Sequence, residues 1–197
     1  GGPAIRKTLS YFAAAMGVRN EQSRALAFTR GSYTYRDDER KLQVKATWTP
    51  STSHTVRAGY FRVDSSRVNV NAGTVMDRAS LYDNESPESL TGISYNAVLR
   101  PRLLIESRYS RRRLTYSGSG ASDTSLAGGT PIWDRSRSDA RFNSPTGCAV
   151  CPGASDGRNN QDLSSKLWFD LPTRRLGAHE IIAGLDLFQE TRTTNTY

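Results

Sequence analysis

Apolar and polar residues alternate along several separate segments of the chain, and the clearest of these is 41–64. Its first half places Leu42, Val44, Ala46 and Trp48 at every second position, with Gln43, Lys45, Thr47 and Thr49 between them. After a polar turn at 50–54, Val56, Ala58 and Tyr60 alternate with Arg57 and Gly59. A period of two suits a β-strand with two different faces and does not suit a helix. The segment therefore predicts a β-hairpin with one apolar and one polar face.

Five more segments show the same alternation, and they predict about seven strands in all. They are 5–17, 91–99, 103–116, 162–171 and 179–190. Short turns are expected at 50–54, 100–102 and 172–178, and long loops at 18–40, 65–90 and 117–161. Consecutive antiparallel strands reverse direction, so all the short turns fall at one end of the sheet and all the long loops at the other. We predict an all-β fold, an antiparallel up-and-down meander of about six to seven strands.

Charged residues at mid-strand positions suggest an unusual environment for this sheet. The polar faces carry Lys45, Arg57, Glu106, Arg108, Lys166 and Asp186. A transmembrane β-barrel explains them, because its apolar face meets lipid while its inner face meets water or a plug. We therefore expect part of a larger transmembrane β-barrel, in which these six residues face the lumen or a plug. A soluble antiparallel sheet with one solvated face would show the same alternation and stays as an alternative.

One irregularity lies in the second half of the opening hairpin. Beyond Tyr60 the alternation inverts, because Phe61 and Val63 fall on the polar face and Arg62 on the apolar face. Either a bulge shifts the register there, or the strand has left the membrane. We favour the exit, because Tyr60 is about where the crossing would end.

The composition is less typical of a compact soluble domain, and its excess of positive charge suggests an anionic partner. Only 36% of the 197 residues are hydrophobic, and the formal net charge is +8. The sequence contains no run of about 18 apolar residues, so it predicts no transmembrane helix. A basic β-domain that binds nucleic acid would interleave aromatic and arginine side chains on an exposed face. Here Trp48, Tyr60, Tyr95 and Tyr109 fall on the apolar faces instead, so we expect no nucleic-acid partner.

Arginine forms one consecutive run, Arg111-Arg112-Arg113, at the loop end of a predicted strand. The planar guanidinium group suits phosphate, so contact with lipopolysaccharide phosphates is one interpretation. The other is a solvated loop base without a specific ligand.

The only two cysteines, Cys148 and Cys151, lie in the longest predicted loop with a C-x-x-C spacing. A structural zinc site would need two more ligands, but His54 and His179 fall at the opposite, short-turn end. A redox motif would need a thioredoxin-like βαβ context, which this pattern lacks. A loop disulfide in an oxidising compartment fits better. No paired carboxylates or Ser-His-Asp arrangement occur, so we expect no enzyme, no metal and no cofactor.

Several short motifs resemble those of a known family. The first twelve residues, GGPAIRKTLSYF, resemble the GGPI-x-[KR]-[DN]-[KR]-LFFF segment that opens the barrel, just after the plug, in TonB-dependent outer-membrane receptors. The closest group is the Oar-like receptors with a carboxypeptidase-regulatory-like N-terminal domain. Residues 42–54 are similar to their K-x-[TD]-W-x-[LP]-[NST]-x-x-H hairpins, residues 95–108 to their YN-x-VL…LF-[LI]-E-[AS]-[KR]-YS pairing, and residues 177–186 to G-x-H-x-[IL]-K-x-G-[FL]-[DE]. Ala4, Thr8 and Ile182 depart from these patterns.

The resemblance implies a bacterial outer-membrane receptor that binds a large ligand through its extracellular loops and takes it up with energy from the TonB complex. Barrels of this family have about 22 strands, so seven strands would form only part of the wall. The implied partners are outer-membrane lipid and lipopolysaccharide, the plug domain, the TonB complex and an extracellular ligand of unknown identity. A non-transport adhesion or structural barrel is the alternative, and a soluble basic β-domain is the third hypothesis.

Overall fold

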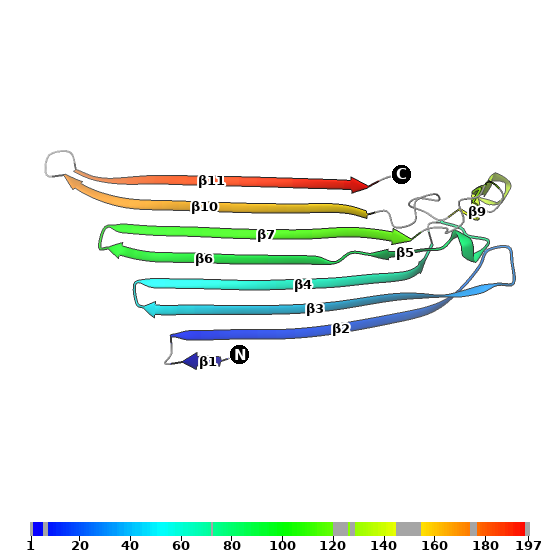
Figure 1. Ribbon diagram of the computed structural model, residues 1–197, viewed down its shortest axis with the longest axis horizontal. Helices are drawn as coiled ribbons and strands as arrows, with labels where there is room; N and C mark the ends of the chain where they lie inside the picture. Colours follow the sequence, from blue (N-terminus) through cyan, green and yellow to red (C-terminus); the bar gives the residue numbers. More distant parts are fainter. Residues whose placement is uncertain are drawn as a thin grey trace.

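The computed structural model of the chain is one broad antiparallel sheet with a small folded cap at one end (Figure 1). It describes residues 2–5, 8–71, 73–119, 126, 129–144, 155–173 and 177–195. The strands of the sheet are β1 (Gly2–Ile5), β2 (Leu9–Ala25), β3 (Ser32–Ser51), β4 (His54–Val70), β5 (Tyr82–Glu85), β6 (Glu88–Arg100), β7 (Leu103–Ser119), β10 (Ser155–Thr173) and β11 (Gly177–Asn195). A second, two-stranded sheet contains β8 (Ile132–Asp134) and β9 (Ala140–Phe142). Short 3-10 turns occupy Arg78–Ser80 and Arg135–Arg137. No described helix is long and apolar enough to span a membrane.

The sheet is an up-and-down meander, which confirms the predicted all-β class and antiparallel topology, although the described residues form nine strands in this sheet instead of about six to seven. Its strands pair in the order β1, β2, β3, β4, then β5 and β6 together, β7, β10 and β11. β5 and β6 share one place between β4 and β7, and they are separated at Ser86 and Pro87. The backbone N–H of Ser86 donates to Ser65 at 2.9 Å, and the Pro87 carbonyl accepts from Thr115 at 3.1 Å. These bonds keep the interrupted strand attached on both sides.

The strands are longer than the sequence predicts, and the loops correspondingly shorter. The expected loop 18–40 is mostly strand, with only 26–31 connecting β2 to β3. The expected loops 65–90 and 117–161 also lose residues at both ends to β4, β6, β7 and β10. The prediction was wrong because both faces of these strand ends are polar. The apolar alternation therefore disappears while the backbone ladder continues.

The two ends of the sheet differ in their connections (Figure 1). At one end lie the short hairpin turns 52–53 and 101–102, within the predicted ranges, and at the same end Thr173 of β10 is directly opposite Gly177 of β11. At the other end lie the longer connections from β2 to β3, from β4 to β5 and from β7 to β10. We call these the turn end and the loop end.

Most of the sheet lacks a buried core. The buried hydrophobic cluster of the described residues consists of Leu26, Tyr33, Val75 and Leu81, all near the loop end. In the described part of the chain no strand pairs with the outer edge of β11, and only the four-residue β1 covers part of the edge of β2. A single-layer sheet buries too little apolar surface to be stable alone. Its faces and edges therefore require a second environment.

Candidate functional site

The cross-strand register brings the apolar positions of the long strands together on one face of the sheet. One row of directly opposed residues runs through Tyr11, Ala46, Ala58, Ile93, Tyr109, Leu163 and Leu187. The next row toward the turn end runs through Leu9, Trp48, Val56, Tyr95, Ser107, Ser165 and Leu185. The hydroxyl groups of Ser107 and Ser165 lie 2.8 Å apart and satisfy each other. We call the whole apolar part of this face, which includes these two rows and the apolar positions next to them, the belt.

Large belt side chains remain accessible. Trp48 is 50% exposed, Ile93 47% and Leu185 56%. Continuous exposed apolar surface on this scale marks contact with a membrane or another protein.

Toward the loop end the same face becomes polar. Its first polar residues beyond the belt are Arg19 on β2, Arg40 on β3, Arg62 on β4, Thr91 on β6, Arg111 on β7, Gln161 on β10 and Gln189 on β11. Two ion pairs lie in this polar border: Arg19 Nε is 2.6 Å from Asp38, and Arg62 Nε is 2.8 Å from Asp64. The register between β3 and β4 is continuous past Tyr60, so no bulge occurs there. Arg62 therefore belongs to the border, and the alternation inverts because the belt has ended.

The belt crosses the strands obliquely. Leu9, the first residue of β2, lies in the row of Leu185, which is eight residues beyond the start of β11. Arg19 lies in the row of Asn195, six residues beyond Gln189, where the border begins on β11. These shifts of eight and six residues accumulate over the six steps from β2 to β11 across the sheet. With standard strand dimensions they correspond to strands tilted by about 35–45° from the normal to the belt.

The opposite face, which we call the charged face, carries all six charged residues predicted to share one side. Arg57, Arg108 and Asp186 lie in one row, together with serine residues on the intervening strands. In the next row toward the turn end, Glu106 is directly opposite Lys166. Lys45 occupies the row on the other side of Arg57, directly opposite Gly59.

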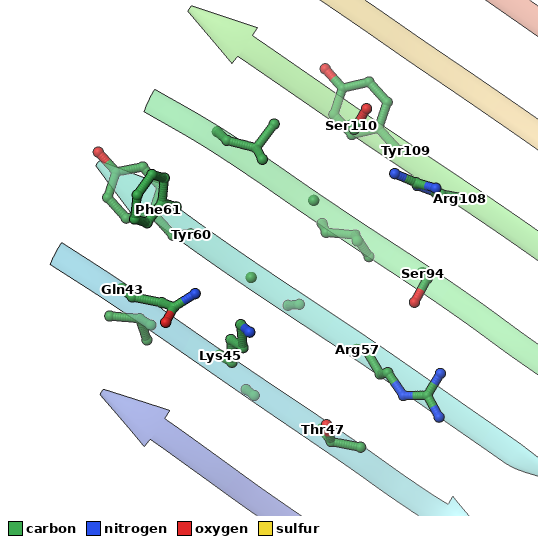
Figure 2. Close-up of a pocket in the computed structure, with 17 residues that line it drawn as sticks. Gln43, Lys45, Thr47, Arg57, Tyr60, Phe61, Ser94, Arg108, Tyr109 and Ser110 are labelled. Carbon is green, nitrogen blue, oxygen red and sulfur yellow. The ribbon is translucent and has the colours of Figure 1, made fainter. Parts of the chain in front are cut away.

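A hollow of 590 Å³ lies on the charged face (Figure 2). Gly59 of β4 is directly opposite Gly92 of β6, so neither strand places a side chain at this point. Figure 2 shows Phe61 at one end of the hollow and Arg57 and Arg108 toward the other. The sequence offered glycines within strands as a signal, but it did not indicate that two of them oppose each other.

The longer connections fold together into a cap, which we define as residues 26–31, 73–81 and 129–144. Its segments are joined by backbone hydrogen bonds, from Ala27 N–H to the Val75 carbonyl at 2.8 Å and from Met76 N–H to the Arg141 carbonyl at 2.8 Å. Arg141 N–H in turn donates to the carbonyl of Thr74 at 2.9 Å. The connections at the loop end therefore form one structured unit rather than separate loops.

One carboxylate joins two of these connections. Asp77 accepts the backbone N–H and the hydroxyl of Ser80, at 3.1 and 2.5 Å. It also accepts the backbone N–H of Asn143, 3.1 Å from each carboxylate oxygen. The hydroxyl of Ser80 accepts the N–H of Ser144 at 3.0 Å, and both serines are buried. The hydroxyl groups of both buried serines thus have partners, which is the condition for a stable small core.

The outer surface of the cap combines aromatic and arginine side chains. Phe28, Trp133 and Phe142 are 62%, 58% and 46% exposed. The Arg141 guanidinium lies 5.0 Å from the centre of the Trp133 ring, within cation–π range. The indole Nε1–H of Trp133 donates to the Ser144 hydroxyl at 2.7 Å, which fixes the position of the ring. Sequence analysis missed this surface, although the aromatics within a polar segment were a signal.

The carboxyl of Asp134, the last residue of β8, has a perturbed pKa. Asp134 accepts the hydroxyl of Ser136 at 2.6 Å and its backbone N–H at 3.0 Å. The Ser136 hydroxyl bond is the largest cause of a lowered pKa of the Asp134 carboxyl, and Arg137 at 3.6 Å contributes in the same direction. The bonds favour the charged form because a carboxylate is the better acceptor.

The predicted arginine run does not form a single patch. Arg111 and Arg113 lie on the belt face, within or beyond the polar border, whereas Arg112 lies on the charged face. Arg112 Nε donates to Glu88 at 2.6 Å. The alternation of strand side chains explains the split, because neighbouring residues point to opposite faces.

The predicted disulfide involves residues outside the described part of the chain, since Cys148 and Cys151 both lie in 145–154. Among the residues that are described, no group of three or more His, Cys, Asp or Glu side chains could hold a metal ion. His54 lies at the turn end, where its Nδ1 is 2.8 Å from the Tyr95 hydroxyl.

Comparison with protein-family models, with curated proteins and with solved structures finds no match to this chain. A functional assignment therefore depends on the belt, the charged face and the cap.

Proposed function

We propose that this chain forms part of the barrel wall of a bacterial outer-membrane TonB-dependent receptor. Such a receptor would bind a large ligand at the loop end and take it up with energy from the TonB complex. The observation that supports this most is the exposed belt, which crosses all the long strands and ends at a polar border. Lipid would cover the belt and supply the apolar environment that the single-layer sheet lacks.

The dimensions of the belt support a membrane crossing. On β10 the belt extends from Leu163 to Leu171, a length of nine residues. At a tilt of about 40° these residues rise about 20 Å, comparable with the apolar band of about 25 Å around outer-membrane barrels. The tilt implied by the stagger also agrees with the roughly 35–45° found in such barrels.

The two faces and the two ends of the sheet suggest how the proposed barrel is oriented in the membrane. Lys45, Arg57, Glu106, Arg108, Lys166 and Asp186 would face the lumen or the plug, where water or polar partners can solvate them. The short turns would be periplasmic and the cap extracellular, as the loop lengths of outer-membrane barrels suggest. Arg111 and Arg113, at the loop side of the belt, would then lie level with lipopolysaccharide phosphates.

The narrower assignment to TonB-dependent receptors is supported by the order of the sequence motifs, from the GGP start to the hairpin at 177–186. A non-transport adhesion barrel would share the belt, and the exposed aromatics of the cap would suit adhesion equally well. We expect no catalytic activity from either protein.

Topology labelling of the full-length protein in intact cells tests the proposal. Single cysteines replace Ser53 at the turn end and Ser138 in the cap, with Cys148 and Cys151 changed to serine in both variants. A membrane-impermeant maleimide should label S138C in intact cells and S53C only after the outer membrane is opened. Labelling of both from the outside would overturn the proposed topology. Binding of the full-length receptor to the purified TonB periplasmic domain would separate a transporter from an adhesin, which should not bind it.

A further inference from the structure

The backbone does not require glycine at the two positions, Gly59 and Gly92, that leave the hollow open. A Cβ atom added at Gly59 would lie 3.9 Å from the nearest atom, the carbonyl oxygen of Val44, and one at Gly92 would lie 3.9 Å from the carbonyl oxygen of Tyr109. These are ordinary van der Waals contacts. Glycine within a strand costs about 0.5–1 kcal/mol relative to alanine, so two opposed glycines weaken this part of the sheet. The effect of the two glycines is therefore to leave open the space that two side chains would otherwise fill.

The cations around the hollow are not held in ion pairs within the described part of the chain. Lys45, Arg57 and Arg108 all line it, and no Asp or Glu is among its lining residues. None of the three takes part in the ion pairs found among the described residues. By contrast, Arg67 and Arg112 on the same face each have a carboxylate partner. Positive charge is therefore concentrated and uncompensated at the hollow, which favours an anion.

The hollow also has an apolar side. Phe61 and Leu90 are directly opposed in the row on the loop side of the two glycines. Arg57 and Ser94 are directly opposed in the row on the turn side. An occupant would thus meet a ring and an aliphatic chain at one end and guanidinium groups at the other.

We infer that this hollow binds an organic anion with a flat or aliphatic apolar body and one carboxylate or phosphate group. The anionic group lies between Lys45, Arg57 and Arg108, and the apolar body covers Gly59 and Gly92 and contacts Phe61. A volume of 590 Å³ falls in the range of small-molecule sites. The inference does not depend on the membrane assignment, because the register of β3, β4, β6 and β7 forms the hollow in any environment. In the proposed barrel it would lie on the inner wall.

Equilibrium dialysis of the full chain in detergent micelles tests the inference, with 2-naphthoate as probe and 2-naphthalenemethanol as its neutral counterpart. We expect one saturable naphthoate site per chain and binding of the alcohol weaker by about tenfold or more, because the charge-assisted bonds are lost. Replacing Arg57 and Arg108 together by glutamine should weaken naphthoate binding by a similar factor and leave binding of the alcohol unchanged. Equal binding of the two probes would overturn the inference.

Two further variants separate the site from the general charge of the sheet. Gly92→Val fills the hollow with a residue that suits strands and should abolish binding of both probes. Arg67→Gln removes one positive charge from the same face, away from the hollow, and should leave naphthoate affinity unchanged. Circular dichroism establishes that each variant keeps the strand content of the parent. Retained binding in G92V, or equal losses in R67Q and in the Arg57 and Arg108 double variant, would contradict the proposed site.

Discussion

Asp77 holds the backbone N–H of Asn143 with both carboxylate oxygens, each at 3.1 Å, across 66 residues of sequence. The same carboxylate also caps the 3-10 turn through the N–H of Ser80. A single side chain thus joins two connections of the cap that the sequence places far apart.

Replacement of Asp77 by alanine should open the cap without unfolding the sheet. The change leaves the N–H groups of Ser80 and Asn143 without their partner, at a local cost of about 2–3 kcal/mol. Limited proteolysis should then cut within 73–81 or 129–144 much faster than in the parent, while the strand signal in circular dichroism persists. Asp77→Asn keeps one acceptor oxygen and should show a smaller effect. Equal proteolysis rates for the parent and D77A would contradict this role.

Charge on the belt should be tolerated far less than charge on the other face. Leu167 lies in the middle of the belt on β10, and Ser164 of the same strand points to the opposite face. In lipid vesicles Leu167→Arg should lower the free energy of unfolding by about 2–4 kcal/mol, because a guanidinium is forced toward hydrocarbon. Ser164→Arg should change it by less than about 1 kcal/mol. Urea titration of both variants measures the difference, and similar losses would argue against a lipid-facing belt.

Two tryptophans should report two different environments. Trp48 is in the belt and Trp133 is on the cap, each about half exposed. In single-tryptophan variants reconstituted in vesicles, brominated lipid should quench Trp48 and iodide should quench Trp133. Quenching of Trp48 by iodide alone would place the belt in water.

The Asp134 carboxyl should titrate below its ordinary pKa of 3.8. Because the pKa is lowered in the folded protein, the bonds of Asp134 stabilise its turn above the ordinary value and lose this effect as the pH falls through the lowered value. Ser136→Ala removes the main cause and should raise the pKa toward 3.8. Carboxyl carbon shifts in an NMR titration between pH 2 and 6 measure this, and an unchanged pKa in S136A would exclude the hydroxyl as the cause.

The sequence was informative wherever one face of a strand is apolar. The alternation around Leu42 and Trp48 places their side chains on the belt, and that around Lys45 and Arg57 places theirs on the charged face. It was uninformative in 18–40, where one face carries Arg19 opposite Asp38 and the other face carries Asn20 opposite Asp37. A period of two cannot be recognised there, although the strands continue.

The cap and the hollow depend on distant pairings that local pattern does not contain. Contact between Asp77 and Asn143 requires two connections to meet, and the hollow requires Gly59 to be in register with Gly92. A shift of one residue between β4 and β6 would place a side chain opposite each glycine and reduce the hollow. Sequence analysis located the amphipathic parts of the long strands and could not supply this register.

The oblique course of the belt also determines how much of the proposed barrel these strands occupy. With a spacing of about 4.7 Å and a tilt of about 40°, each strand contributes about 6 Å to the circumference. Seven strands then form an arc of about 43 Å, whereas about 22 strands would close a cylinder about 43 Å across. The chain would thus form about a third of the wall, with its cap over that sector of the rim. A ligand wider than the sector would have to contact loops from the remaining strands as well.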